Sequence, residues 1–162
     1  MKIGVTLDIN GRDYPIQVEP RKTLADAIRE DCGQTGTHTG CEHGVCGACT
    51  ILLDGEPVRS CLMFAVQAAG RRIRTVEGLA GKDSQGEQLH PLQRAFIEHH
   101  GLQCGFCTPG FLMLAAGTLE REPDISDDAL LEVLSSNLCR CTGYKNIVKA
   151  VRAAAAEMRV RR

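Results

Sequence analysis

The chain has 162 residues, of which 43% are hydrophobic and 24% charged, so its composition is that of a globular protein. The formal net charge of −1 argues against nucleic acid as a partner. The sequence opens without a signal-peptide core, and no apolar stretch approaches the roughly 18 residues of a membrane span. We therefore expect a cytoplasmic protein without a membrane span. Nine cysteines stand out, because clustered cysteines in a reducing compartment more often bind metals than form disulfides.

The N-terminal half is predicted to form a small mixed sheet with one helix. Alternating apolar residues predict strands, and Asn10-Gly11 and Asp54-Gly55 are typical hairpin turns between them. A helix-start signal lies at Thr23, and a glycine-rich loop follows over residues 33–47. The strands that the pattern predicts span residues 3–9, 14–18, 50–53 and 73–76.

The C-terminal half has a helical pattern, so the chain as a whole is predicted to be of the α+β class. A polar stretch at residues 79–86 suggests a linker between a first domain, 1–78, and a second domain, 87–162. Proline at a first helical position and serine or threonine before it mark helix starts. The four predicted helices begin at Pro91, Thr108-Pro109, Ser126 and Thr142-Gly143-Tyr144.

The first domain contains four cysteines at C-x4-C-x2-C with a fourth further along, which is the spacing of plant-type [2Fe–2S] proteins. They are Cys41, Cys46, Cys49 and Cys61. Three thiolates come from one tight loop, which Gly44 and Gly47 allow to curl. Zinc fits less well because it prefers C-x2-C pairs, and a Rieske site would need two histidines on one iron.

The second domain contains a C-x2-C and a C-x-C motif, formed by Cys104, Cys107, Cys139 and Cys141. This spacing alone leaves zinc open beside an iron–sulfur cluster. Cys107 directly precedes the Thr108-Pro109 helix start, and Cys141 directly precedes Thr142-Gly143-Tyr144. Both pairs are therefore expected at helix N-termini, where the positive end of the helix dipole favours thiolates and a negatively charged cluster.

Three cysteine-bearing segments, residues 40–50, 101–110 and 137–144, read GCEHGVCGACT, GLQCGFCTPG and NLCRCTGY. Together they resemble the small subunit of the molybdenum hydroxylases, the xanthine oxidase family. The likeness is greatest to the small subunit of aerobic-type carbon monoxide dehydrogenases and of related aldehyde and N-heterocycle hydroxylases. The resemblance implies a plant-type ferredoxin-like (β-grasp) domain, followed by an all-α four-helix domain that binds a second [2Fe–2S] cluster.

The resemblance also implies the function and the partners. The chain would be an electron-transfer subunit of an oxidoreductase and would itself hold no catalytic residue. A large subunit would bind molybdopterin, often as the cytosine dinucleotide, and a medium subunit would bind FAD, in a heterotrimer or a dimer of heterotrimers. Electrons would pass from molybdenum through the second cluster and then the first cluster to FAD. In this family Gln103 would contact the pterin, and Cys141 would lie against it as well as binding iron.

Two other functions remain open at this point. The chain could be a stand-alone ferredoxin-type carrier, although such carriers tend to be strongly acidic and need only one cluster domain. It could also be a zinc-stabilised interaction module. Cys32 belongs to neither motif and is expected to be a small, buried, apolar side chain.

Overall fold

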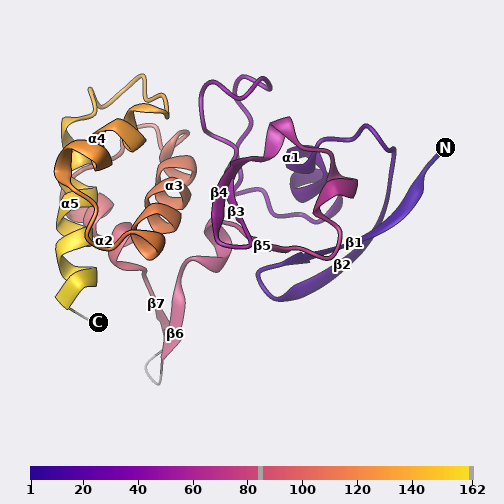
Figure 1. Cartoon of the computed structure of the whole chain (residues 1–162), viewed down its shortest axis with the longest axis horizontal. Coiled ribbons are helices and arrows are strands. Elements are labelled where there is room, and N and C mark those ends of the chain that lie inside the picture. The colour runs from indigo at the N-terminus through magenta and orange to yellow at the C-terminus, as the bar shows by residue number, and fades with distance from the viewer. Residues whose placement is uncertain (84–85, 161–162) are drawn as a thin grey trace.

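Five strands of the first half form one mixed sheet, with the order β2-β1-β5-β3-β4 (Figure 1). The computed structural model describes residues 1–83 and 86–160. The strands are β1 (Ile3–Ile9), β2 (Arg12–Val18), β3 (Thr50–Leu53), β4 (Glu56–Arg59) and β5 (Arg72–Arg74). β1 runs antiparallel to β2 and parallel to β5, while β3 and β4 form the second hairpin. Both predicted hairpins and the mixed sheet are confirmed.

One short helix packs on this sheet. It begins as α1 (Leu24–Asp26) and continues as a π-helical turn (Ala27–Asp31). The hydroxyl of Thr23 accepts the N–H of Asp26 at 3.1 Å, which confirms the predicted N-cap. The apolar side chains of the helix are buried in the core of the sheet domain, where Cys32 also lies. Three 3-10 turns complete this half, at Ser60–Leu62, Ala65–Ala68 and Val76–Gly78.

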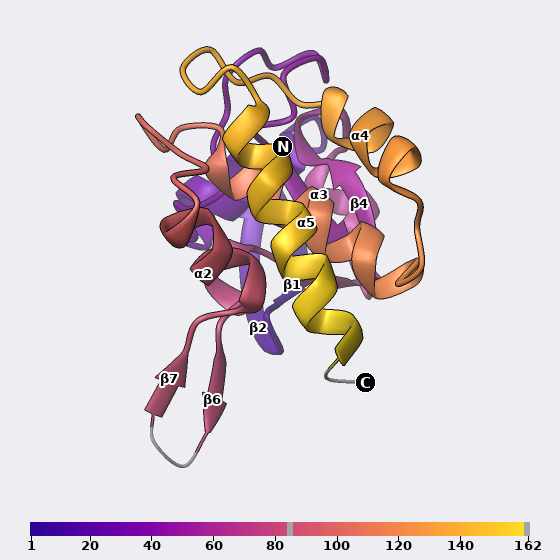
Figure 2. The ribbon, with the colours of Figure 1, turned by 90° about the vertical axis from the view of Figure 1, so that its left-hand side faces the viewer.

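The expected linker contains a small two-stranded hairpin. Its strands, β6 (Gly81–Asp83) and β7 (Gly86–Gln88), pair antiparallel and project from one end of the molecule (Figures 1 and 2). Residues 84–85, which belong to the expected linker, lie outside the described residues. The domain boundaries inferred from composition stay a prediction.

The second half consists of helices, as predicted. They are α2 (Pro91–Glu98), α3 (Thr108–Arg121), α4 (Asp127–Ser135) and α5 (Lys145–Val160). The prediction that α5 opens at Thr142-Gly143-Tyr144 is wrong. Gly143 and Tyr144 have φ angles of 67° and 68°, and this left-handed backbone cannot belong to a right-handed helix. In the described part of the chain, no helix has both the length and the apolar character for crossing a membrane.

Helix α3 joins the two halves. Most of its residues are buried, because it packs on β3 and β4 on one side and on the other helices elsewhere. Small residues allow this contact: a Cβ on Gly117 would lie 2.6 Å from Leu52 of β3, and one on Gly110 only 2.3 Å from the carbonyl oxygen of Gly47. The helix thus brings the second half against the loop that holds the first cysteine motif.

We expect Gly110→Ala to destabilise the protein by about 1–3 kcal/mol, because the new methyl group would collide with a backbone oxygen that cannot move aside easily. The substitution would otherwise favour a helix. Gly81→Ala is the matched control, since nothing lies within 4 Å of its Cβ position. Urea unfolding of both variants measures the effect. A Gly110→Ala protein as stable as the control would contradict this account of the interface.

Candidate metal centres

The loop before β3 curls tightly around the first cysteine motif. Glu42, Gly44 and Gly47 have φ angles of 58°, 82° and 76°, in the left-handed region that favours glycine. The curl directs the backbone N–H of Cys46 to the sulfur of Cys41 at 3.4 Å. A side chain at Gly47 would collide with Asn137, so glycine is required there for space as well as for conformation. Sequence reasoning identified the two glycines but not the strained Glu42.

The four sulfurs of the first motif gather in two pairs. The side chain of Cys41 interacts with that of Cys46, and the side chain of Cys61 interacts with that of Cys49. Ser60 secures the second pair, because its hydroxyl donates to the carbonyl oxygen of Cys49 at 2.7 Å. Cys49 and Cys61 are only 1% and 8% exposed, while the other pair is half-buried.

The surroundings of these thiols shift their pKa values in opposite directions. Backbone N–H groups of Cys46 and His43 lower the pKa of Cys41 to about 6, so this sulfur is held as a thiolate at neutral pH. Burial raises the pKa of Cys61 to about 12, and the neighbouring Cys49 adds to the effect. The loop thus offers one thiol that ionises readily, Cys41, and one, Cys61, that must release a proton when a metal binds.

The second motif pairs its sulfurs across the chain. The sulfurs of Cys104 and Cys141 lie 3.4 Å apart, and Cys107 interacts with Cys139. The first of these pairs is exposed and the second is half-buried. Although burial opposes ionisation of Cys139, hydrogen bonds from the hydroxyl and N–H of Thr142 lower its pKa. Burial raises the pKa of Cys107 to about 12.

Of the two cysteine pairs in the second domain, only the C-x2-C pair lies at a helix N-terminus as expected. Cys107 lies at the N-terminus of α3 as predicted, but it is the N-cap residue itself, a position that the sequence had suggested for Thr108. Cys141 is separated from α5 by three residues, two of them in left-handed conformation, so its predicted position at the helix start is wrong. Burial is the main cause of the raised pKa of Cys107, and the neighbouring Cys139 adds to it.

The donor set fits two-iron clusters. Within residues 1–83 and 86–160, no three His, Cys, Asp or Glu side chains are arranged to hold a single metal ion. The sulfurs lie in pairs instead, and a [2Fe–2S] cluster takes two thiolates on each of its irons. Thr108, next to Cys107, has a buried hydroxyl oxygen with no hydrogen-bond partner among the described residues. Cluster sulfur beside Cys107 would supply the missing acceptor.

We call residues 40–50 the first cysteine loop and residues 137–144 the second cysteine loop. The two loops lie together at the end of the molecule opposite the β6–β7 hairpin (Figure 2). The N–H of Leu138, next to Cys139, donates to the carbonyl oxygen of Cys46 at 2.9 Å. Phe106, between the cysteines of the C-x2-C motif, stacks on His38 at 4.9 Å between ring centroids. Sequence analysis gave His38 no role, since only the folded chain brings it to the second motif.

Two further residues singled out in the sequence, Gln103 and Cys32, lie outside the sulfur pairs. Gln103 is exposed, beside the exposed Cys104. Cys32 is 7% exposed and lies in the core of the sheet domain, as expected of a small apolar side chain. Tyr144 was not predicted: its hydroxyl accepts the N–H of Cys139 at 3.0 Å and donates to the carbonyl of Asn137. Its place in the segment NLCRCTGY was the one available signal.

Comparison with known proteins agrees with this geometry. Residues 7–76 match the family model of the 2Fe-2S iron-sulfur cluster binding domain, and residues 75–152 match that of the [2Fe-2S] binding domain. The fold and the two matches define an iron–sulfur protein with two cluster-binding domains. The match of the second domain also decides against the zinc-stabilised module.

Similar proteins extend over nearly the whole chain. The small subunit of nicotine 6-hydroxylase from Paenarthrobacter nicotinovorans is 55% identical, over 93% of this chain and 88% of its own length. The gamma subunit of caffeine dehydrogenase from Pseudomonas sp. (strain CBB1) is 54% identical, over 91% and 88%. A chain of quinoline 2-oxidoreductase from Pseudomonas putida 86 superposes with a TM-score of 0.88 at 53% identity, covering 98% of this chain and 97% of that one.

The chain therefore belongs to the small iron–sulfur subunits of the molybdenum hydroxylase family, and it is the electron-transfer component of an oxidoreductase. The predicted fold is confirmed with it: a ferredoxin-like domain is followed by a helical cluster-binding domain. The subunit character of the relatives also decides against a stand-alone carrier.

Two buried cysteines allow a matched test of the cysteine sets. We expect Cys32→Ala to retain about four irons per chain, the content of two [2Fe–2S] clusters. Cys61→Ala should lose about half of the iron, because Cys61 belongs to a sulfur pair and Cys32 does not. Iron and acid-labile sulfide analysis of the purified variants measures both. Loss of iron from Cys32→Ala, or full iron content in Cys61→Ala, would refute the assignment.

Proposed function

We propose that this chain relays electrons between two larger subunits through two [2Fe–2S] clusters. Cys41, Cys46, Cys49 and Cys61 hold the first cluster, and Cys104, Cys107, Cys139 and Cys141 hold the second. The pairing of these sulfurs supports the proposal. Each bound cluster supplies one-electron redox chemistry, while the polypeptide fixes the distance between them and tunes them through N–H···S hydrogen bonds.

A single contact supports the relay most directly, namely the hydrogen bond from the Leu138 N–H to the Cys46 carbonyl at 2.9 Å. Cys46 and Cys139 are ligands of different clusters in this proposal, and Leu138 adjoins Cys139. The path from one sulfur to the other therefore runs through two short stretches of backbone and one hydrogen bond. No gap through solvent interrupts it.

The exposed edge of the second site supports the entry point. Cys104 and Cys141 are exposed, and so are Leu102 and Leu138 nearby. Exposed apolar side chains beside redox ligands suit contact with a partner protein. We place the large subunit here, with its molybdopterin as the cytosine dinucleotide. Gln103 and Cys141 then lie against the pterin. The medium subunit with FAD then takes electrons from the first cluster.

The three relatives named above suggest the substrate class of the complex. Nicotine, caffeine and quinoline, the compounds in their names, are all nitrogen heterocycles. We propose that the complex of this chain oxidises such a compound. It works in the cytoplasm as a heterotrimer or a dimer of heterotrimers. None of the nine cysteines is in a disulfide, which suits a reducing compartment. Native mass measurement of the purified complex tests the assembly.

The relay is tested by spectroscopy and metal analysis. The isolated protein should contain about four irons and four sulfides, and dithionite should produce two distinct paramagnetic signals. A colourless protein that contains zinc, or a protein with one signal only, would overturn the proposal.

We expect Cys41→Ser to stall the relay before FAD. The change weakens the first cluster and leaves the second site intact, so substrate oxidation in the large subunit should stay possible while its electrons no longer reach FAD. Rapid mixing of the purified complex with its substrate follows the reduction of FAD. FAD reduction at the wild-type rate would contradict the proposed order of the clusters.

We expect Gln103→Ala to reduce the molybdenum content of the complex without loss of iron. The amide would lose its contact to the pterin, and no cysteine is changed. Such supporting contacts are worth roughly 10- to 100-fold in affinity at metal sites. Molybdenum and iron analysis of the same preparation measures both effects, and unchanged molybdenum content would count against this role of Gln103.

A further inference from the structure

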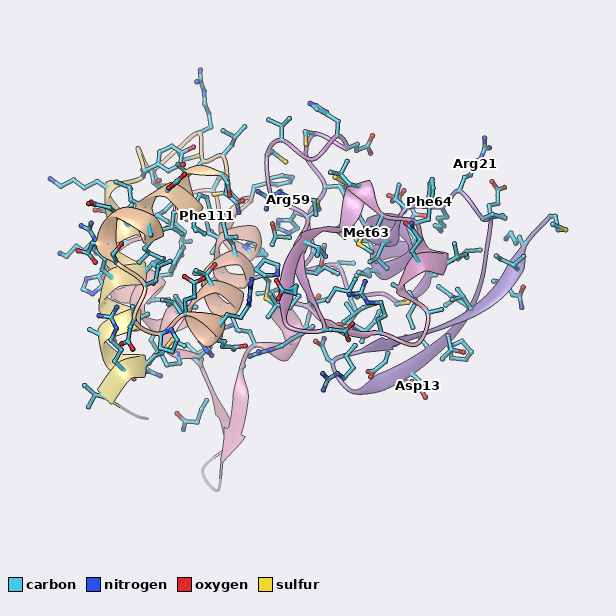
Figure 3. All side chains as sticks on the ribbon, in the orientation of Figure 1. Asp13, Arg21, Arg59, Met63, Phe64 and Phe111 are labelled. Carbon is cyan, nitrogen blue, oxygen red and sulfur yellow. The ribbon has the colours of Figure 1, made fainter. Side chains whose placement is uncertain are left out.

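Arg59 connects the sheet to the helical half beside the two cysteine loops (Figure 3). It is the last residue of β4 and precedes Ser60 and Cys61. One guanidinium nitrogen, Nη1, donates to the hydroxyl of Thr50. The other, Nη2, donates to the carbonyl oxygen of Ser136 at 3.0 Å and to its hydroxyl at 3.3 Å. One side chain therefore holds two segments that are far apart in the sequence.

On the sheet side, the contact of Arg59 leads to the first cysteine loop. Thr50 follows Cys49 directly and is only 2% exposed. Its hydroxyl donates to the carbonyl oxygen of Gly47 at 2.7 Å. Because that hydroxyl has one proton, it can accept from Arg59 while it donates to Gly47. Arg59 thus completes a hydrogen-bond chain that ends beside Cys46.

On the helical side, the contact leads to the second cysteine loop. Ser136 is followed by Asn137, whose side-chain amide donates to the same Gly47 carbonyl at 3.4 Å. Leu138 comes next, with its N–H on the carbonyl of Cys46. Asn137 and Leu138 therefore bond the first loop directly, and Ser136 is held through Arg59, which makes the outermost contact.

We propose that Arg59 is a positioning residue that keeps the two cysteine loops in register and so sets the rate of electron transfer between the clusters. This inference rests on the proposed relay. Arginine suits the task because its planar fork can donate to two partners at once in fixed directions, whereas lysine presents one compact charge. Removal of Arg59 frees Ser136 and loosens the Leu138–Cys46 hydrogen bond on which the relay depends.

Another arginine provides a matched control. Arg121, the last residue of α3, pairs with Glu56 of β4 at 2.6 Å. It also joins the two halves and also contacts β4, but Glu56 is at the opposite end of that strand from Arg59. Both members of the pair are about half exposed, so the pair adds little stability. Arg121→Gln therefore removes an arginine from the same interface without touching either cysteine loop.

The test compares Arg59→Gln, Arg59→Lys and Arg121→Gln in the full chain with both clusters present. When a light flash delivers one electron to the protein, that electron should redistribute between the two clusters about tenfold more slowly in Arg59→Gln than in wild type. The reason is that a small displacement of the reacting centres lowers the rate of a transfer reaction strongly. Arg59→Lys should lie between this variant and wild type, and Arg121→Gln should equal wild type. Iron content and the unfolding midpoint show that each variant is loaded and folded.

Hydrogen exchange supplies a readout that does not require electron transfer. The backbone N–H groups of residues 136–139 should exchange faster in Arg59→Gln than in Arg121→Gln. The role of Arg59 would be overturned if Arg59→Gln showed the wild-type rates of electron redistribution and of hydrogen exchange. It would also be overturned if Arg121→Gln slowed electron redistribution as much as Arg59→Gln does. If Arg59→Gln loses its clusters, Arg59→Lys decides by the same two measurements. If the wild-type protein itself contains no iron, the proposed relay is refuted, independently of the role of Arg59.

Discussion

The close approach of the two cysteine loops is the contact on which the rest of the structure depends. The carbonyl of Gly47 accepts hydrogen bonds from Thr50 and from the buried amide of Asn137, while Gly110 of α3 packs against it. Asn137 is 1% exposed, and a buried amide that lost its partner would be costly. The two loops therefore have little freedom to separate. The packing of α3 on β3 and β4 serves to hold them there.

The paired sulfurs differ in burial. Cys104 and Cys141 of the second motif are exposed, whereas Cys49 and Cys61 of the first motif are buried. Solvent exposure and hydrogen bonds to sulfur both set the reduction potential of a cluster. The two sites differ in both respects, so the protein provides unequal surroundings for two clusters of one kind. A relay within a complex is well served by this difference, because the exposed sulfur pair is open to a partner protein and the buried pair is protected from solvent.

Local signals in the sequence were sufficient for most of the fold. The Asn10-Gly11 turn and the Thr23 cap act through neighbouring residues, and the structure has both as predicted. The start of α5 was wrong because a left-handed pair, Gly143 and Tyr144, intervenes before the helix. A pattern of apolar residues contains no information about that turn. The hydrogen bonds of the Tyr144 hydroxyl, which hold the Cys139 loop, depend on it.

The sequence by itself determined that the chain has two cysteine motifs suited to metal binding, because these motifs and the glycines between them are short-range patterns. Only the tertiary structure decided how the sulfurs pair. In the second motif each cysteine of C-x2-C meets a cysteine of C-x-C, so Cys104 meets Cys141 and Cys107 meets Cys139. The tertiary structure likewise gave Arg59 its partners. Such contacts join residues distant in sequence, and they exist only once α3 has packed against the sheet and the remaining helices.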